Sequence, residues 1–296
     1  MASVKSLLFR ICLCGLALLV CELPSQADET ANTIDVVTYN IRYANPRDGE
    51  DVWSHRVEAV ADFLAGYDIA GLQEVTAPQL DELVTRLPEH GWYGLGRDDG
   101  KRGGEHAPIL YRRDRFEPID QGTFWLSESP AKIGVRGWDA ALPRTCTWMT
   151  LLDKQSGNRL WIANTHFDHR GSQARTESGK LIQRVARERG GDLPVIVMGD
   201  FNCSQESDPY RALTSGGYLV DARSASQAAV TGPDSTWNGF KEIAPGRIID
   251  HLFVHGPVTV QQFNTLDPKT KNGRFASDHL PVQIRIHLSQ PGSTTE

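Results

Sequence analysis

Short apolar runs separated by polar, glycine-rich segments recur along most of the chain. Eight of these runs are rich in β-branched and aromatic side chains, and none is longer than seven residues. Runs of that length and composition are typical of buried β-strands rather than of long helices. The expected strands cover residues 34–39, 69–72, 109–111, 147–152, 160–163, 195–198, 248–254 and 282–286.

Two segments between these runs show the spacing of amphipathic helices. The first covers residues 54–65, with Ser54 as a candidate N-cap, and the second covers residues 172–189, with Ser172 in the same position. Hairpin-like neighbours and helical crossovers are thus mixed. This mixture predicts an α/β fold in which two packed, mixed sheets are flanked by helices.

Two long segments, 94–108 and 231–247, are rich in glycine, proline and aspartate. Loops of this length inside a compact domain usually carry function or are mobile. The segment 28–288 is long enough for one large domain with a substantial core. We expect the tail, 289–296, to be disordered.

The N-terminus has the pattern of a secretory signal peptide. Basic residues precede an apolar run at 11–20, and a small-x-small cleavage site follows at 25–27, so residues 1–27 are expected to be removed. The run is too short for a permanent membrane helix, and nothing later in the chain reaches about 20 apolar residues. The mature protein should be secreted or periplasmic, without a transmembrane segment. Lipid anchoring at Cys21 stays open, but Val20 stands where a small residue is normally required.

The formal net charge of the chain is −6. Such a balance argues against a protein whose affinity rests on a broad basic surface for polyanions. Cys146 and Cys203 are the two cysteines that follow the signal peptide. They are either paired in a disulfide or buried separately as small side chains.

Polar residues with metal-binding or acid–base chemistry follow the ends of the expected strands. Asn or Asp beside a strand usually serves a turn, and a single buried His is usually structural. Independent turn residues have no reason, however, to supply both a metal-binding set and an acid–base set. The residues in question are Asn40, Glu74, His166, Asp200, Asn202, Asp250, Asp278 and His279.

The types of side chain in this set suit hydrolysis of a phosphate ester. Glu74 and Asp278 offer carboxylate oxygens, and Asn40 and Asn202 offer amide oxygens, which suit Mg²⁺ or Mn²⁺ rather than zinc. A hard cation polarises a phosphoryl oxygen and offsets the charge of the transition state.

Two imidazoles complete the set. His166 and His279 can hydrogen-bond a phosphate or move a proton near neutral pH. Asp250 is a candidate orienter of His279, and Asp200 is a candidate base that aligns the attacking water.

Six short segments resemble, in order and spacing, the motifs of the endonuclease/exonuclease/phosphatase superfamily. They are Thr-Tyr-Asn at 38–40, Gln-Glu at 73–74, Asn-Thr-His at 164–166, Gly-Asp-Phe-Asn at 199–202, Ile-Asp-His at 249–251 and Ser-Asp-His-Leu-Pro-Val at 277–282. This superfamily includes deoxyribonuclease I, sphingomyelinases, inositol polyphosphate 5-phosphatases and deadenylases. The segments 104–111, 123–128 and 137–144 look like an exported or microbial branch related to the deadenylase-like group.

The resemblance implies a four-layered α/β sandwich with the active site at one end. It implies that Asn40, Glu74 and Asp278 hold the metal, and that Asp200 and Asn202 orient the water and the phosphate. His166 and His279 would contact phosphoryl oxygens, with Asp250 supporting His279, and Arg144 would clamp the phosphate. Arg144 in a surface ion pair is the alternative. The sequence departs from a frequent Tyr at His251, which we expect to affect packing only.

Three tryptophans, Trp125, Trp138 and Trp237, lie in expected loops or at strand edges. They could stack on a base or a sugar at the rim of the pocket, although a tryptophan is by default a core residue with one polar contact.

The resulting hypothesis is a monomeric, exported hydrolase of a small phosphorylated substrate, either a phosphomonoester or a phosphodiester. An extracellular endo- or exonuclease with the same fold is the main alternative, because basic residues such as Arg42 and Arg247 occur near the motifs. An inactive ligand-binding module would be expected to have lost at least one of the expected residues. A glycosidase would not use the two asparagines and two histidines.

Overall fold

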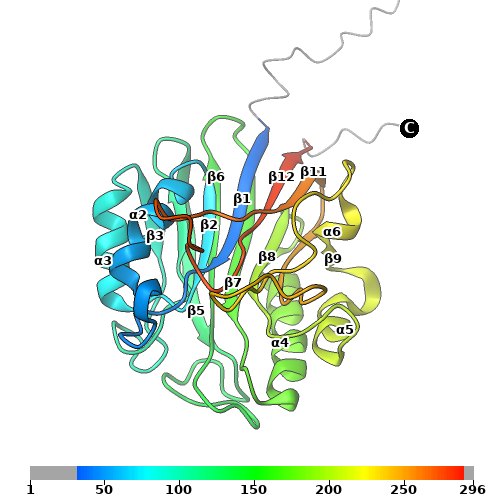
Figure 1. The fold of residues 1–296 in the computed structure, drawn as a ribbon. Coiled ribbons are helices and arrows are strands. Elements are labelled where there is room, and N and C mark those ends of the chain that lie inside the picture. Colours follow the sequence, from blue (N-terminus) through cyan, green and yellow to red (C-terminus); the bar gives the residue numbers. More distant parts are fainter. Residues whose placement is uncertain (1–31, 290–296) are drawn as a thin grey trace, which may run out of the picture.

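The computed structural model describes residues 32–289, which form two six-stranded sheets packed face to face (Figure 1). The first sheet has the order β11-β12-β1-β2-β4-β3. Its only parallel pair among the described residues is β1 with β2, so the sheet is mixed. Its strands are β1 (Thr33–Asn40), β2 (Ile69–Gln73), β3 (His90–Tyr93), β4 (Ile109–Arg112), β11 (Val258–Thr265) and β12 (Val282–Leu288).

The second sheet has the order β5-β6-β7-β8-β10-β9. It is mixed as well, because β7 and β8 run parallel while β10 pairs with β8 in the antiparallel sense. Its strands are β5 (Phe116–Trp125), β6 (Thr145–Asp153), β7 (Arg159–His166), β8 (Val195–Asp200), β9 (Val220–Asp221) and β10 (Asp250–His255).

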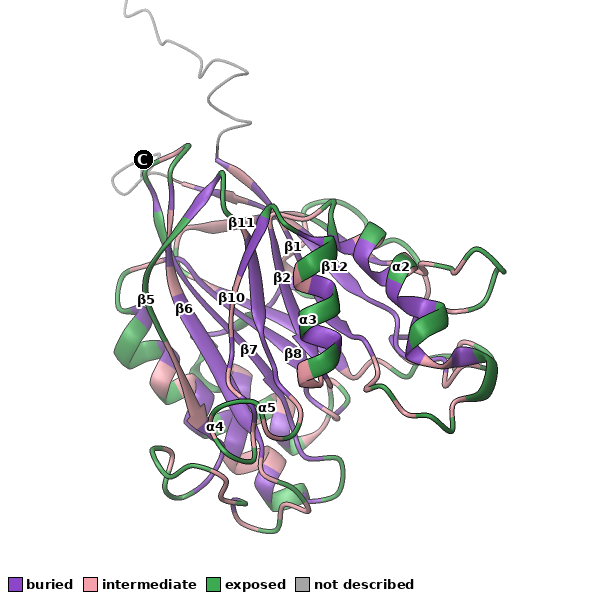
Figure 2. Ribbon diagram, turned by 90° about the vertical axis from the view of Figure 1, so that its left-hand side faces the viewer, coloured by how far each residue is buried: buried purple, intermediate pink, exposed green. Residues whose placement is uncertain are grey.

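Helices cover the outer face of each sheet, which gives four layers (Figure 1). The helices α2 (Trp53–Leu64) and α3 (Ala77–Arg86) lie on the first sheet, and α4 (Ser172–Gly190) and α5 (Asp208–Thr214) lie on the second. The short α6 (Ala222–Ala225) follows β9. One apolar cluster fills the space between the sheets and two more fill the spaces beneath the helices, so the inner strands are buried on both faces (Figure 2). The expected four-layered α/β sandwich is confirmed.

All eight expected strands are present, and four further strands are not among the expected ones. These four, β3, β5, β9 and β11, are the edge strands of the two sheets. An edge strand has one unpaired side and exposes more of its residues, so it needs no continuous apolar run. β5, for example, contains Pro118 and Gly122 and has five consecutive exposed residues.

Both expected helices are present, but the capping residues predicted for them are wrong. Ser54 lies inside α2, whose N-cap is Val52, and Ser172 is the first residue of α4. The free N–H groups at the start of α4 are bound by Asp139, whose Oδ1 accepts from the Ala174 nitrogen at 2.7 Å. This cap comes from a residue more than 30 positions away, so no local pattern could predict it.

The signal peptide predicted for residues 1–27 and residues 290–296 of the predicted tail lie outside the described residues. Ser289 belongs to the folded domain, because its nitrogen donates to the Pro257 carbonyl at 3.1 Å. Cys146 and Cys203 are both free and buried, so the two are not paired. Within residues 32–289, the helices are too short or too polar to span a bilayer.

Candidate active site

The polar residues at the strand ends come together in one pocket of about 420 Å³. The sheet register brings them there, because Asp200 at the end of β8 is paired with His166 on one side and with Asp250 on the other. Seven of the nine residues predicted for the site line this pocket, and Asn40 and Asp250 lie directly behind them. The seven are Glu74, Arg144, His166, Asp200, Asn202, Asp278 and His279.

Buried amide side chains join the two sheets at this end of the molecule. Asn164 on β7 donates to the carbonyl oxygens of Leu72 and Pro108, at 2.8 and 2.9 Å, and accepts from Gln73 at 2.6 Å. A Cβ atom at Gly71 would lie 2.8 Å from the Asn164 side chain, so this close approach requires glycine at 71. These hydrogen bonds fix the distance between the strands that carry the site.

Glu74 and Asn40 form the carboxylate side of the pocket. Asn40 Nδ2 donates to Glu74 Oε1 at 3.2 Å and to Asp200 Oδ2 at 3.0 Å, so one amide group bridges the two carboxylates. The second oxygen of Glu74 accepts from the Tyr43 nitrogen at 3.1 Å. Asn40 itself is fully buried, and its amide oxygen accepts from the Arg42 nitrogen at 3.0 Å. Asn40 thus supports Glu74 from behind the pocket wall.

Asp278 completes this side from a different part of the chain. Its carbonyl oxygen accepts from the nitrogens of Asn238 and Gly239, which lie in the long loop 231–247. The buried guanidinium of Arg56 on α2 donates to the carbonyls of Ile41 and Ala276, at 2.7 and 2.9 Å. Arg56 therefore ties the segment after Asn40 to the segment before Asp278.

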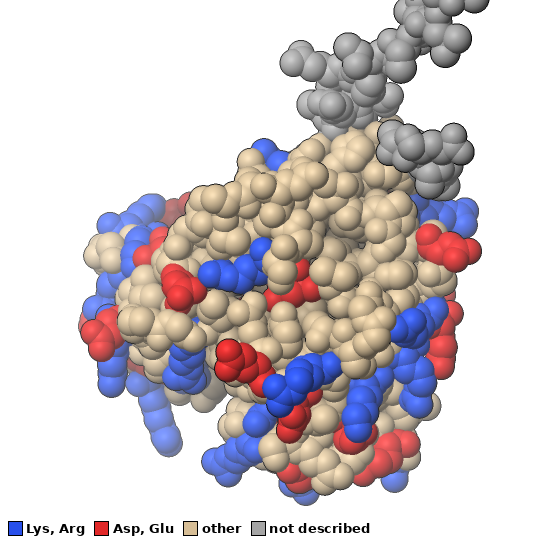
Figure 3. Space-filling model, turned by 90° about the vertical axis from the view of Figure 1, so that its right-hand side faces the viewer, with Lys and Arg blue, Asp and Glu red and all other residues tan. Residues whose placement is uncertain are grey.

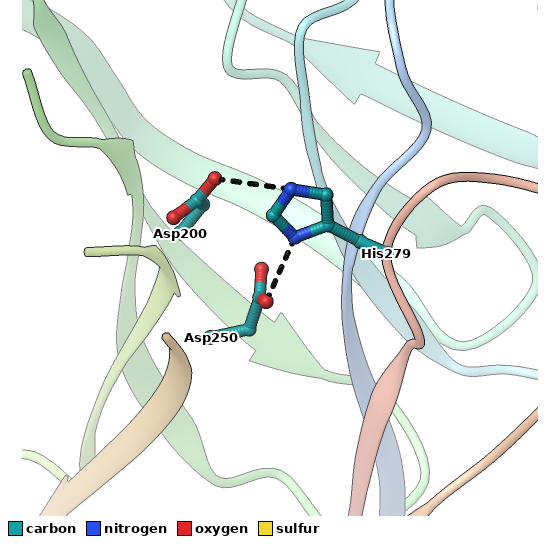
Figure 4. A group of neighbouring side chains, drawn as sticks. All are labelled: Asp200, Asp250 and His279. Carbon is teal, nitrogen blue, oxygen red and sulfur yellow. Dashed lines mark hydrogen bonds and ion pairs between the residues drawn. The ribbon is translucent and has the colours of Figure 1, made fainter. Parts of the chain in front are cut away.

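Asp250, His279 and Asp200 form a buried row, joined by one hydrogen bond and one ion pair (Figure 4). His279 Nδ1 lies 2.9 Å from Asp250 Oδ2, and His279 Nε2 lies 3.8 Å from Asp200 Oδ2. Burial alone would lower the pKa of His279, but the charges of Asp250 and Asp200 outweigh it and raise that pKa. Burial and the charge of Asp250 raise the pKa of Asp200. His279 is therefore an imidazolium at neutral pH, hydrogen-bonded to Asp250 and facing Asp200.

His166 differs from His279 in its charge. Burial and the neighbouring Arg144 lower the pKa of His166 well below its usual value, so its ring is neutral at pH 7. Arg144 Nη1 lies 3.0 Å from His166 Nδ1, and because arginine only donates, this nitrogen is the acceptor. The proton of the neutral ring is then on Nε2, which faces the carboxylate oxygen Oδ2 of Asp200 at 3.5 Å. The amide nitrogen of Asn202, which is also a donor, lies 3.1 Å from the same ring nitrogen and donates to the Phe167 carbonyl. The pocket thus contains one charged and one neutral imidazole.

Backbone conformation concentrates strain in the pocket wall. Arg42, Glu74 and Asn202 have φ angles of 58°, 62° and 47°, in the left-handed region that side chains other than glycine avoid. All three residues line the pocket. Strain of this kind costs about 1–3 kcal/mol per residue and clusters at functional sites. The surrounding hydrogen bonds, such as that from the Asn202 nitrogen to Asp200 Oδ1 at 2.9 Å, hold these conformations in place.

Asp200, Asp250 and His279 lie close enough together to surround a metal ion. However, both nitrogens of His279 face carboxylates, and the raised pKa keeps the ring protonated. A protonated imidazole has no lone pair for a metal. Glu74 and Asp278 present carboxylate oxygens to the same pocket and fit a hard cation better.

The structure also locates the other residues named from the sequence. Trp125 is buried and donates to the Arg97 carbonyl at 2.7 Å, and Trp138 packs against the core beneath α4, so neither lies at the pocket. Trp237 does line it, with the Arg247 guanidinium 3.8 Å from its ring centre. His251 packs against Phe201, and its Nε2 lies 2.9 Å from the Cys203 carbonyl.

Arg144 is buried, which excludes the surface ion pair. Its donors point at His166, His169 and Asp168, so it orients imidazoles as well as lining the pocket. Glu105 and His169 are among the lining residues that were not predicted. Glu105 lies in the segment 104–111, and the resemblance of this segment to a branch of the superfamily is the one feature of the sequence that could have pointed to Glu105.

A family model described as the Endonuclease/Exonuclease/phosphatase family matches residues 37–279. The chain belongs to this family. Its members hydrolyse phosphate esters, are typically dependent on divalent metals, and act on phosphorylated substrates or nucleic acids. The family's range therefore includes phosphatases and nucleases alike.

Solved structures of bacterial members are similar over nearly their whole length. A family protein from Bacteroides vulgatus is 39% identical with a TM-score of 0.82, over 87% of this chain and 99% of that one. A mannosyl-6-phosphatase from Bacteroides thetaiotaomicron is 37% identical with a TM-score of 0.80, over 86% and 99%. Human Nocturnin is 24% identical over 177 residues, which are 55% of this chain and 39% of Nocturnin. The chain thus spans less than half the length of that curated relative.

Replacement of Asp250 by asparagine should lower kcat by about 100-fold or more, because His279 loses the charge that keeps it protonated. The side chain keeps its size and one hydrogen-bonding oxygen, so the unfolding temperature should change little. Steady-state kinetics and thermal denaturation measure the two effects. A kcat within threefold of the wild-type value would remove the Asp250–His279 pair from the chemistry.

Proposed function

We propose that this protein is an exported, metal-dependent phosphomonoesterase that acts on a small phosphorylated substrate. The observation that carries this proposal is the pocket, which a neutral His166 and a charged His279 line together with the carboxyl groups of Glu74 and Asp278. Its volume of about 420 Å³ is that of a small-molecule site. The relative named as a mannosyl-6-phosphatase, which is 37% identical, supports a monoester as the substrate.

Glu74 and Asp278 would hold the cation, with Asn40 fixing the position of Glu74. Oxygen ligands of this kind select Mg²⁺ or Mn²⁺ over zinc. When bound, such a cation polarises a phosphoryl oxygen and offsets the negative charge that develops during hydrolysis. Arg42, whose Nη1 lies 3.8 Å from Asp278 Oδ2, adds a positive charge at the same wall.

The remaining residues would bind the phosphate and position the water. His166 can donate its Nε2 proton to one phosphoryl oxygen, and the His279 imidazolium can donate to another. Asp200 lies between them, 3.5 Å from His166 and 3.8 Å from His279, where its carboxylate can align the water and accept its proton. The raised pKa of Asp200 makes it a stronger base than an exposed aspartate. Asn202 would bind the phosphate beside His166.

A nuclease remains the second candidate because of Trp237 and Arg247. Their stacked pair lines the pocket and offers a cationic, aromatic surface of the kind that binds bases. The electrostatics favour the smaller substrate. The chain is acidic overall, and on the face shown in Figure 3 basic and acidic side chains are interspersed rather than gathered into a basic band.

Export and a monomeric state are part of the same proposal. The expected cleavage after residue 27 would leave every described element intact, since β1 begins at Thr33. N-terminal sequencing of the protein recovered from the periplasm or the medium should start at residue 28. An intact N-terminus in the cytoplasm would contradict export.

A panel assay tests the activity. The substrates are a sugar phosphate, a phosphodiester, single- and double-stranded DNA, RNA and sphingomyelin, each with and without divalent metal. We expect fastest turnover of the monoester, abolition by EDTA, and recovery with Mg²⁺ or Mn²⁺. Preference for a nucleic acid would establish the nuclease instead, and no turnover of any substrate would point to an inactive binding module.

Glu74→Ala should abolish metal-dependent turnover in this assay while the protein stays folded, because the cation loses one of its two pocket carboxylates. Glu89→Ala is the matched control, since Glu89 is exposed and lies outside the pocket. Activity of the Glu74 variant near that of the control would remove Glu74 from the metal site.

A further inference from the structure

Glu105 places a carboxylate in the pocket wall on the side of Arg144 and His166. Arg97 holds it with two hydrogen bonds, at 2.6 Å to Oε2 and 2.9 Å to Oε1. Arg144 Nη1 and His166 Nδ1 both lie 4.0 Å from Oε2, beyond hydrogen-bond distance. The Glu105 side chain is 19% exposed. Its oxygens therefore keep acceptor capacity on the pocket side.

A carboxylate at this position is not suited to bind phosphate, because the two anions repel each other. A cationic group on the substrate is not favoured either, since Arg97 already neutralises Glu105 and Arg144 adds a second positive charge nearby. The remaining partner is a neutral donor. Hydroxyl groups are neutral donors, and a hydrogen bond to a charged acceptor is stronger than one between neutral groups.

His169 offers the complementary donor at the mouth of the same pocket. Arg144 Nη2 lies 3.0 Å from His169 Nδ1, and because arginine only donates, Nδ1 accepts. Burial and the charge of Arg144 lower the pKa of His169, so the ring is neutral with its proton on Nε2. One guanidinium thus orients His166 with one nitrogen and His169 with another.

We propose that Glu105 and His169 form a subsite that binds the hydroxyl groups of the alcohol part of the substrate. A hydroxyl group both donates and accepts, so it matches a carboxylate and an imidazole N–H on one wall. The preferred substrates are then phosphomonoesters of polyhydroxylated alcohols, such as sugars, rather than of simple alcohols. This inference rests on the proposed phosphomonoesterase function and names its substrate class.

The test compares glucose 6-phosphate with ethyl phosphate, which has no hydroxyl on its alcohol part. In Glu105→Gln, the ratio of kcat/KM for the sugar phosphate to that for ethyl phosphate should fall about fivefold to tenfold, because a neutral amide oxygen accepts a weaker hydrogen bond than a carboxylate. His169→Phe, which removes the donor, should lower the same ratio. Glu89→Gln, at an exposed position outside the pocket, should leave the ratio at the wild-type value.

A ratio that stays at the wild-type value in both variants would overturn the subsite. If kcat/KM falls equally for both esters, the two residues have a general structural role; if it falls for neither, they do not contact the substrate. If the wild-type protein hydrolyses neither ester, the proposed function is refuted. The subsite is then tested separately, by measuring how tightly each ester binds. Calorimetric titration of Asp200→Asn should show tighter binding of glucose 6-phosphate than of ethyl phosphate, and Glu105→Gln in that background should abolish the difference. Equal affinities for the two esters in Asp200→Asn would contradict the subsite.

Discussion

The hydrogen bonds that cross between the two sheets at one end of the sandwich are the constraint on which the site depends. Asn40 from the first sheet donates to Asp200 in the second at 3.0 Å, and Gln73 donates to Asn164 across the same gap at 2.6 Å. All four side chains are buried, so a missed partner would cost about 1–3 kcal/mol. This penalty selects one relative position of the sheets, in which residues from both meet in one pocket.

Two kinds of group line that pocket. Glu74 and Asp278 suit a cation, and the two imidazoles, one neutral and one positively charged, suit a phosphate. The difference between the imidazoles follows from their partners, since His166 faces a guanidinium and His279 faces two carboxylates. The phosphate would lie against the imidazoles, and the alcohol part of the substrate toward Glu105.

How much the sequence predicts depends on how local the responsible physics is. The eight inner strands carry continuous apolar runs because both faces are covered, and they were predicted; the four edge strands lack such runs and were not. The helices were predicted but not their caps, since Asp139 reaches α4 from a distant loop. The polar residues at the strand ends could be assigned to one site from the sequence, because strand ends meet at one edge of a sheet and because their motifs resemble those of the superfamily. Glu105 and His169 could not, because only the folded Arg97 and Arg144 give them their orientation.

We infer that the cation binds to Glu74 and Asp278, while the row of Asp200, Asp250 and His279 positions the water and the phosphate. Anomalous diffraction from crystals soaked in Mn²⁺ tests this directly, because the signal locates the metal independently of activity. We expect a peak at about 2.0–2.3 Å from carboxylate oxygens of Glu74 and Asp278. A peak centred between Asp200, Asp250 and His279 instead would contradict it.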